Sequence, residues 1–369
     1  MTLKTWDYLQ GHKEEKDEIF SAIEDVLESG QLILGENVRN FEHSFAHYCG
    51  VSHGIGVNSG TDALFLALKA LGIGKGDEVI TVSNTAIPTI SAIVAVGATP
   101  RFIDINSQTY LMDTSQLEQA VSKSTKCIVP VHLFGQCVDM TAVNSAAKDY
   151  GLFVIEDCAQ AHGAQFKCQK AGSMSDLAIF SFYPTKVLGG YGDGGMVVTN
   201  DQSYFEKVSR LRCYGTENNY FAQEHGYNSR LDELHAAILL TKLKWLDSYI
   251  ERRRSIAEYY DLLLRDTELI LPYATADCSH VYHQYVVRHP ERNKLLSELK
   301  TKDIELSIHY PWPVHLMPAY QYLNYKIGDL PHTEQVANEI FSLPMFPTLG
   351  QEEQAIVGKY LKDIVTTLI

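Results

Sequence analysis

The chain has 369 residues, 45% of them hydrophobic and 21% charged, which is enough for one large or two smaller globular domains with a sizeable core. Its formal net charge of −14 argues against nucleic acid and anionic membrane surfaces as partners. The seven cysteines include no CxxC pair, and neither a signal peptide nor an apolar run of ~20 residues is visible, so we expect a cytoplasmic protein without a disulfide framework, a membrane span or a bound metal.

Helical and strand patterns alternate through the first 180 residues. Residues 14–29 predict an amphipathic helix with Ile19, Ile23, Val26 and Leu27 on its apolar face. Residues 62–73 are apolar on nearly every face, which predicts a buried helix. Short β-branched runs then alternate with helical patterns such as 141–150. The predicted strands are 78–82, 101–105, 127–132, 152–156 and 177–182. This alternation predicts an α/β fold with a mostly parallel sheet and helices on both faces.

The pattern changes after residue 190. Residues 194–199 follow the preceding strand too closely for a helical crossover, so we expect them to pair antiparallel. Residues 231–264 predict two helices that meet near Tyr249. The rest mixes helices with predicted strands at 280–287 and 306–310, which indicates a smaller α+β domain. We therefore expect a large domain over 1–250, N-terminal helix included, and a small domain over 251–369.

Lys186 lies in a glycine-rich segment, SFYPTKVLGGYGDGGMVVT, at 181–199. Glycine lets a backbone approach a ligand closely, and a lysine held in such a loop can attack a carbonyl. For a lysine taken alone, a solvated surface position is the better explanation. The remaining motifs therefore decide its role.

Polar residues at neighbouring strand ends supply those motifs, because ligands of parallel α/β sheets gather there. Asp157 follows a buried strand, and Ser59-Gly60-Thr61 opens a helix whose free N–H groups favour a phosphate. Alone, Ser59 could be only a helix cap, and Asp157 a cap or the partner of a distant arginine. Together with Lys186 they indicate pyridoxal 5'-phosphate (PLP). The lysine would form a Schiff base, the carboxylate would pair with the pyridinium nitrogen, and the helix end would take the phosphate.

The chain resembles the DegT-type sugar-nucleotide aminotransferases, which are PLP enzymes of the aspartate aminotransferase fold (fold type I). The resemblance covers nearly the whole chain. The motifs that carry it are SGQLILG (29–35), NSGTDAL (58–64), GIGKGDEVI (72–80), GATPRFIDI (97–105), PVHLFGQ (130–136), VIEDCAQAHGA (154–164), SFYPTKVLGGYGDGG (181–195) and GYNSRLDELHAAIL (226–239).

The resemblance implies roles for individual residues. Lys186 would hold PLP covalently and shuttle the proton, Asp157 would keep the ring nitrogen protonated, and Gln160 would lie beside the ring and its 3-hydroxyl. The implied phosphate ligands are Gly60, Thr61 and Ser181. Asn228 would reach the phosphate from the other subunit, so the resemblance implies a homodimer with shared active sites. Arg230 would make either a salt bridge or a ligand contact.

The sequence departs from the family pattern at Ala86, where many members have an aromatic residue stacked on the PLP ring. Members that aminate C4 of a sugar tend to have a histidine before the lysine loop and a GEGG ending, whereas this chain has Tyr183 and GDGG. The resemblance is closest to dTDP-3-keto-6-deoxyhexose 3-aminotransferases, which implies L-glutamate as donor and a dTDP-3-amino-3,6-dideoxyhexose as product. The alternatives are a UDP-linked 3-keto-2-acetamido sugar acid as substrate, and a non-catalytic PLP-binding regulator.

Four further residues are candidates for the sugar site: Tyr183, His309, Tyr310 and His315. For each, a place in the packed interior is an equally good explanation. A structural role is the default for two other histidines, His132 and His162, because a histidine near a site in sequence is often only part of the core.

Overall fold

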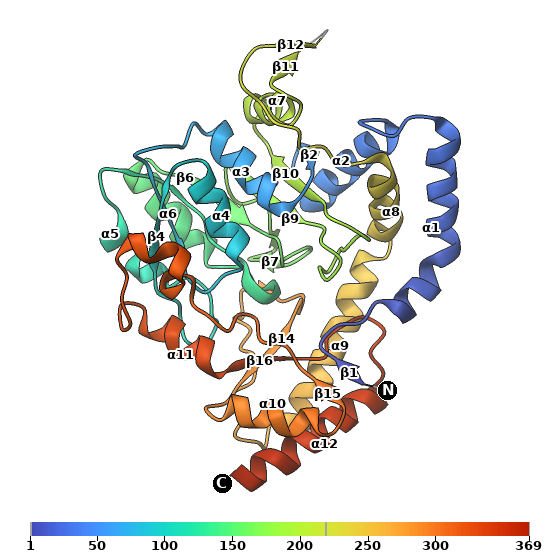
Figure 1. Ribbon diagram of the computed structural model, residues 1–369, viewed down its shortest axis with the longest axis vertical. Helices are drawn as coiled ribbons and strands as arrows, with labels where there is room; N and C mark the ends of the chain where they lie inside the picture. Colours follow the sequence, from blue (N-terminus) through green and yellow to red (C-terminus); the bar gives the residue numbers. More distant parts are fainter. Residues whose placement is uncertain (1, 218–219, 369) are drawn as a thin grey trace.

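The computed structural model describes residues 2–217 and 220–368, and a seven-stranded mixed sheet forms its centre (Figure 1). Its strands lie in the order β2-β10-β9-β6-β5-β3-β4. Six of them run in the same direction, and β10, which lies between β9 and β2, is antiparallel to both. The strands are β2 (His53–Val57), β3 (Glu78–Val82), β4 (Thr99–Ile103), β5 (Thr125–Ile128), β6 (Phe153–Asp157), β9 (Leu177–Ser181) and β10 (Gly195–Thr199).

Helices cover both faces of this sheet, which explains why its strands are apolar on both sides. In β9, Ala178 and Phe180 pack into a core formed with α2, α6 and α8, whereas Leu177 and Ile179 pack into a second core formed with α3, α4 and α7. On the first face lie α2 (Glu36–Cys49), α6 (Met140–Tyr150) and α8 (Glu233–Leu243). On the second lie α3 (Gly60–Ala70), α4 (Ile87–Ala95) and α7 (Gln202–Leu211). The predicted α/β class is confirmed.

The C-terminal part has its own core. There β14 (Tyr285–Arg288) pairs antiparallel with β16 (Ile340–Leu343), beside α10 (Arg292–Lys300) and α12 (Gln351–Leu368). The N-terminal strand β1 (Leu3–Lys4) pairs with β15 (Ile304–Glu305) in this same part. The chain reaches it through α9 (Leu246–Leu264), which runs unbroken past residue 250. The smaller elements are α5 (Leu117–Ala120), α11 (Pro331–Glu339), β7 (Gln165–Phe166), β8 (Gln169–Lys170), β11 (Thr216–Glu217), β12 (Phe221–Ala222) and β13 (Cys278–Ser279).

One C-terminal segment leaves this part and packs on the large sheet. Val314, Tyr320 and Leu330 belong to the core that α3 and α4 share with the strands. The hydroxyl of Tyr325 accepts a hydrogen bond from the backbone N–H of Phe102 in β4, at 2.9 Å. Figure 1 shows this orange-red stretch lying against β4 before it enters α11.

Most predicted elements of the large sheet are present, with shifted ends. The prediction for 78–82 matches β3, and 194–199 is antiparallel as expected. The strands predicted at 101–105 and 127–132 each begin two residues earlier and end earlier, as β4 and β5. Helix α1 (Leu9–Ser29) buries Ile19 and Val26 but leaves Leu27 58% exposed, so Leu27 is not on its packed face.

Three predictions about the second half are wrong. The helices α8 and α9 meet at residues 244–245, not at Tyr249, and no glycine or proline marks that break. Only the second half of 280–287 is a strand. Residues 306–310 form no strand, because their one sheet contact is an isolated bridge between Ser307 and Ser342. In the described ranges, no helix combines the length and apolarity needed to cross a membrane.

Candidate active site

A cavity of about 480 Å³ opens at the carboxyl ends of β6 and β9 and at the start of α3. Its lining contains most of the residues predicted from the sequence. They are Gly60, Thr61, Asp157, Gln160, Ser181, Tyr183, Lys186, His309 and Tyr310. Asn228 and His315 are outside this lining. The parallel strands thus bring together a lysine, a carboxylate and a helix N-terminus that are far apart in the sequence.

The N-terminus of α3 forms an anion cradle at one end of the cavity. Ser59 is the N-cap, and its Oγ accepts a hydrogen bond from the N–H of Asp62 at 3.1 Å. Gly60 and Thr61, whose N–H groups have no acceptor within the helix, line the cavity. A Cβ on Gly60 would lie 2.7 Å from the Cβ of Ser181, so only glycine lets the helix start this close to β9. The helix dipole and the Ser181 hydroxyl therefore favour a phosphate here.

Asp157, the last residue of β6, is buried and also lines the cavity. One carboxylate oxygen accepts from the Thr89 hydroxyl at 2.8 Å and the other from the N–H of Ala159 at 3.1 Å. Burial raises the pKa of this carboxyl, while the two hydrogen bonds and the positive charge of Lys186 act in the opposite direction. Thr89 was not predicted from the sequence, because it approaches Asp157 only through the packing of α4 on the sheet.

Lys186 follows β9 on a turn in which its own N–H donates to the carbonyl of Tyr183 at 2.9 Å. Burial lowers the pKa of its amine from the ordinary 10.5 to about 8, and the negative charge of Asp157 limits that fall. An amine with this pKa is substantially neutral just above neutral pH. It can therefore attack a carbonyl and can both take up and release a proton there.

Gln160 and Tyr310 form a hydrogen-bonded pair beside Asp157. The Gln160 amide oxygen accepts from the backbone N–H of Phe134 at 2.7 Å, and this fixes the orientation of the amide. Its Nε2 then donates to the Tyr310 hydroxyl at 3.1 Å. Burial raises the pKa of Tyr310 to about 12, so this phenol stays protonated near neutral pH.

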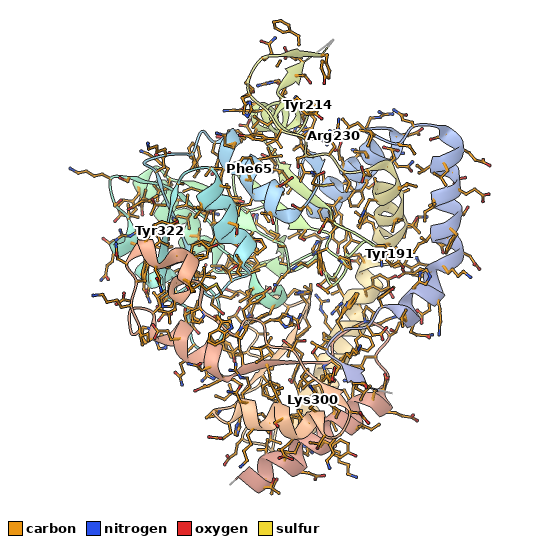
Figure 2. All side chains as sticks on the ribbon, viewed as in Figure 1. Phe65, Tyr191, Tyr214, Arg230, Lys300 and Tyr322 are labelled. Carbon is orange, nitrogen blue, oxygen red and sulfur yellow. The ribbon has the colours of Figure 1, made fainter. Side chains whose placement is uncertain are left out.

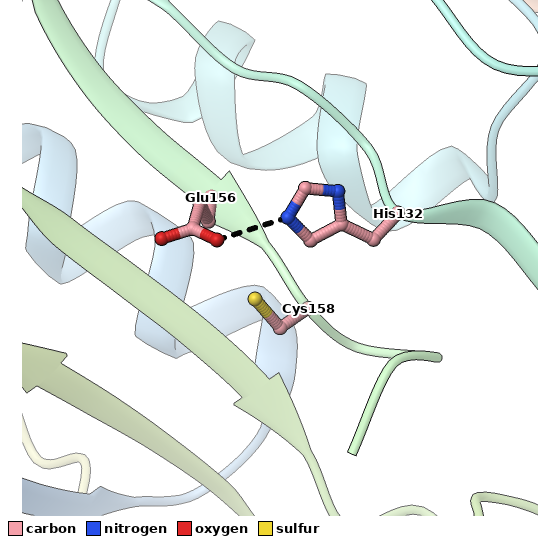
Figure 3. A group of neighbouring side chains, drawn as sticks. All are labelled: His132, Glu156 and Cys158. Atoms are coloured by element: carbon pink, nitrogen blue, oxygen red, sulfur yellow. Dashed lines mark hydrogen bonds and ion pairs between the residues drawn. The ribbon is translucent and has the colours of Figure 1, made fainter. Parts of the chain in front are cut away.

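His132, Glu156 and Cys158 lie together beneath this site, with ligand atoms within 4.8 Å of one another (Figure 3). The polar side-chain atoms of His132 and Glu156 already have hydrogen-bond partners. The N–H of Val138 donates to His132 Nδ1 at 3.1 Å, so Nε2 carries the proton and donates to Glu156 at 3.0 Å. Glu156 also accepts from the backbone N–H groups of residues 172 and 174 and from the Ser175 hydroxyl. The group is therefore a buried hydrogen-bonded support next to Asp157, and the structural explanation of His132 is confirmed.

His162 is buried among aromatic rings. Its ring centroid lies 5.2 to 6.2 Å from those of Phe45, Phe180 and Phe182. Neither ring nitrogen has a hydrogen-bond partner among the residues that the structure describes. Burial, followed by the charge of Lys186, lowers the pKa of His162 to about 3, so the ring is neutral and packs as part of the core.

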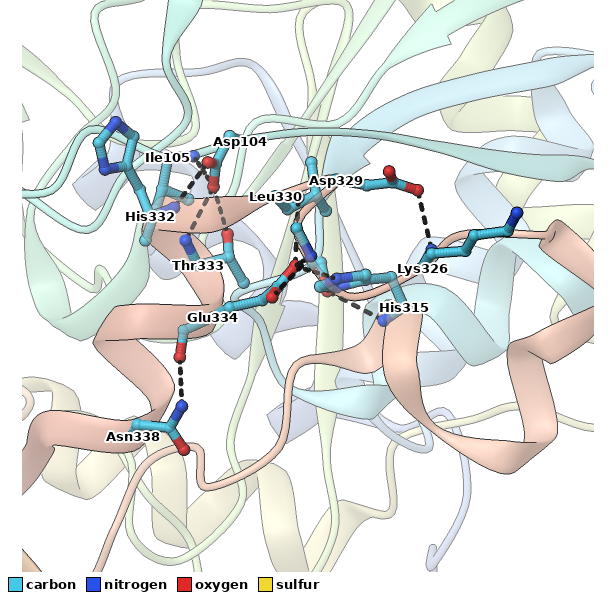
Figure 4. Close-up of polar contacts among 12 residues, drawn as sticks. Asp104, Ile105, His315, Lys326, Asp329, Leu330, His332, Thr333, Glu334 and Asn338 are labelled. Atoms are coloured by element: carbon cyan, nitrogen blue, oxygen red, sulfur yellow. Dashed lines mark hydrogen bonds and ion pairs between the residues drawn. The ribbon is translucent and has the colours of Figure 1, made fainter.

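His315 lies outside the cavity and links the segment before α11 to the large sheet. Ser83 Oγ, just after β3, accepts the backbone N–H of His315 at 3.0 Å and is 2.7 Å from its Nδ1. The Glu334 carboxylate can only accept, so His315 Nε2 carries the ring proton and donates to it at 3.3 Å (Figure 4), and Nδ1 accepts from the Ser83 hydroxyl. Nearby, Asp104 accepts from the N–H groups of residues 332 and 333 at the start of α11. The structure thus gives His315 a structural position, in contrast to its candidacy for the sugar site.

Ala86 is the N-cap of α4 and lines the cavity together with Thr85 and Pro88. The phenol rings of the described lining are those of Tyr183, which is 50% exposed, and Tyr310. Without an aromatic side chain at position 86, α4 presents only small groups to the cavity.

Asn228 is exposed, and its carbonyl accepts a hydrogen bond from the Asn58 amide at 3.1 Å. The guanidinium of Arg230 stacks over the Tyr214 ring at 5.5 Å, and within the described chain it forms no ion pair. The salt bridge expected for Arg230 is therefore not formed within the described chain, and the ligand contact stays a prediction.

The polar groups of the cavity lining match the functional groups of PLP one by one. The helix N-terminus matches its phosphate, the buried Asp157 carboxylate matches a protonated ring nitrogen, and the Lys186 amine matches its aldehyde carbon. Together with the α/β fold, these groups define the class of PLP-dependent enzymes of fold type I.

The chain belongs to the DegT/DnrJ/EryC1/StrS aminotransferase family, whose model matches residues 13–362. It is 50% identical, over the full length of both chains, to the dTDP-3-amino-3,4,6-trideoxy-alpha-D-glucose transaminase of Micromonospora megalomicea subsp. nigra. It is 43% identical to a pleiotropic regulatory protein of Geobacillus stearothermophilus, with 98% of each chain covered. The crystal structure of S. venezuelae DesV in complex with a ketimine intermediate superposes with a TM-score of 0.97 at 40% identity, covering 99% of this chain and 98% of that one.

Proposed function

We propose that this protein is a PLP-dependent aminotransferase that moves an amino group from L-glutamate to C3 of a dTDP-3-keto-6-deoxyhexose. The product is a dTDP-3-amino-3,6-dideoxyhexose. The observation that carries the proposal is the convergence of Lys186, Asp157 and the α3 N-terminus on one cavity. The family and its dTDP-sugar transaminase relative support the choice of reaction and substrate.

When bound, PLP supplies an electrophilic carbon and a ring that accepts electrons. The residues of the chain supply the rest. Gly60, Thr61 and Ser181 bind the phosphate, and the charge of Asp157 holds a proton on the ring nitrogen. Lys186 Nζ would take a proton from the donor carbon that bears the amino group, and its pKa near 8 would let it give up a proton again near neutral pH.

The second subunit and the domain division belong to the same proposal. Asn228 is exposed and outside the cavity of its own chain, which is compatible with a role in the active site of a partner within a homodimer. We divide the chain into a PLP-binding domain over 1–250 and a small domain over 251–369. The separate core around β14 and β16 supports this division, while β1 extends from the first domain into the second.

The absorption spectrum of the purified protein tests the proposal in two steps. L-Glutamate should convert the spectrum of bound PLP to that of the aminated cofactor, and dTDP-3-keto-6-deoxyglucose should then restore the first spectrum. If only a UDP-linked 3-keto-2-acetamido sugar acid reversed the glutamate response, that sugar acid, and not the dTDP-linked hexose, would be the substrate. No response to any amino donor would favour a PLP-binding regulator, the alternative that the Geobacillus relative's name raises.

The pH dependence of cofactor capture should report the lowered pKa of Lys186. Only the neutral amine attacks the aldehyde, so the rate at which cofactor-free protein binds PLP covalently should rise about tenfold from pH 7 to 9 and then level off, with a midpoint near 8. Stopped-flow absorbance measures this rate. A rate that keeps rising through pH 10 would mean an ordinary lysine.

A further inference from the structure

The turn formed by residues 133–136 lies beside the active-site cavity, which Leu133 lines, and it contains a strained residue. Phe134 has a φ of 60°, in the left-handed region that residues other than glycine seldom adopt. Its backbone N–H donates to the Gln160 amide oxygen at 2.7 Å, and this contact orients Gln160 in the cavity lining. A conformation of this kind persists only where surrounding contacts hold the backbone, so those contacts decide how Gln160 is oriented.

Backbone contacts to this turn come from residues 273–284, which lead into β14 in the C-terminal part of the chain. That part lies below the large sheet in Figure 2 and includes Lys300 of α10. The carbonyl of Gly135 accepts a hydrogen bond from the N–H of Val281 at 3.0 Å. A Cβ on Gly135, whose φ is 102°, would lie 2.7 Å from Cγ2 of Val281, so glycine is what lets the two segments approach this closely.

Gln136 adds the side-chain contacts between the same two segments. Its Nε2 donates to the carbonyl of Tyr273 at 3.1 Å, and its Oε1 accepts from the N–H of Thr275 at 2.8 Å. Gln136 is only 2% exposed, and two hydrogen bonds from one buried amide are enough to offset the strain of a single left-handed residue such as Phe134. Gln136 does not line the active-site cavity, so it can influence the cavity only through other residues.

Gln160 is the residue through which this constraint reaches the cofactor site. Because Phe134 fixes the amide oxygen of Gln160, its Nε2 is directed to the Tyr310 hydroxyl, 3.1 Å away. The family resemblance predicts that Gln160 lies beside the PLP ring and its 3-hydroxyl. If the turn relaxed, the Gln160 amide would be free to rotate, and the hydrogen bonding on this side of the ring would change.

We propose that Gln136 is a positioning residue, which ties residues 273–275 to the turn at Phe134 and so sets the orientation of Gln160. Through this path the C-terminal part of the chain controls the hydrogen bonding at the 3-hydroxyl of PLP. The inference rests on the proposed function, because it requires PLP in the active-site cavity. It does not depend on which sugar nucleotide is the substrate.

A pH titration of the absorption spectrum of bound PLP tests this inference, because hydrogen bonds at the 3-hydroxyl shift the midpoint of the spectral change. Gln136→Met removes both hydrogen bonds of the side chain but keeps its length. It should move the midpoint by about 0.5 pH unit or more, which is about a threefold change in the protonation equilibrium. Gln354→Met is the matched control, because Gln354 is also buried and also donates to a backbone carbonyl, that of Ile256, away from the cavity. Its midpoint should equal that of the unmodified protein.

Gln160→Met removes the residue through which Gln136 is inferred to act. It should move the midpoint in the same direction as Gln136→Met does, and the double variant should move it no further than Gln160→Met alone. If Gln136→Met did not fold, Gln136→Asn, which keeps the amide but shortens its reach, would replace it in the same comparison.

Two results would overturn the inference while PLP is bound. They are equal midpoints for Gln136→Met and Gln354→Met, and shifts of Gln136→Met and Gln160→Met that add in the double variant. If the unmodified protein showed no spectrum of bound PLP, the proposed function would be wrong and the inference with it, so the two failures are distinguishable.

Discussion

Lys186→Ala should lower turnover by about a thousandfold or more, because no other group of the described cavity lining can replace its amine. Burial lowers the pKa of His309 to about 4 and raises that of Tyr310 to about 12, so neither exchanges protons readily at pH 7 to 8. The variant should still bind PLP without a covalent bond, since the α3 N-terminus and Asp157 are untouched. Initial rates with L-glutamate and the keto sugar measure the loss.

Borohydride reduction measures the covalent link independently of turnover. It should fix the cofactor permanently to the unmodified protein but not to Lys186→Ala. Lys148→Ala, on the exposed surface of α6, is the control and should behave like the unmodified protein. If Lys186→Ala retained more than about 1% of turnover, another base would have to be present.

Asp157→Asn should lower kcat by about a hundredfold to a thousandfold while leaving the protein folded. The substitution keeps the shape of the side chain and removes its negative charge, so a protonated ring nitrogen would lose its buried counter-charge, a loss of about 3–4 kcal/mol of transition-state stabilisation. The same charge raises the pKa of Lys186, so the midpoint of PLP capture should fall below 8 in this variant. Steady-state kinetics and the pH profile of capture measure the two effects.

Asp139→Asn provides the matched control for this substitution. Asp139 is exposed and caps α6, and asparagine caps a helix about as well as aspartate does. Its activity and pH profile should match those of the unmodified protein. An Asp157→Asn variant with kcat within threefold of the unmodified enzyme would show that the charge at position 157 is not needed.

Site residues could be predicted from the sequence where they stand at the end of a strand or at the start of a helix. Asp157, Ser181 and Lys186 were predicted because each stands at or just after a short apolar run, and parallel strands bring such ends together. The cradle at Gly60 and Thr61 was predicted for the same reason, from a helix start. Predicting these residues requires only local sequence patterns and the rule that ligands bind at the carboxyl ends of parallel strands.

Contacts between distant segments could not be predicted. Thr89 reaches Asp157 across 68 positions, and Ser83 reaches His315 across 232. Both contacts depend on how α4 and the segment before α11 pack against the sheet, and no local sequence pattern predicts that packing. Strand β2 was missed because its sequence, HGIGV, contains two glycines that disfavour a strand until β10 pairs with it.

The return of the C-terminal segment to the large sheet limits how relatives of this protein can be recombined. A chimera joined at residue 250 would take Ser83 and β1 from one parent but His315 and β15 from the other. In each pair, the two contacting segments would then come from different parent proteins. The junction itself would lie within α9, which is one continuous helix. Libraries that exchange the small domain should therefore also exchange β1 and the residues that follow β3.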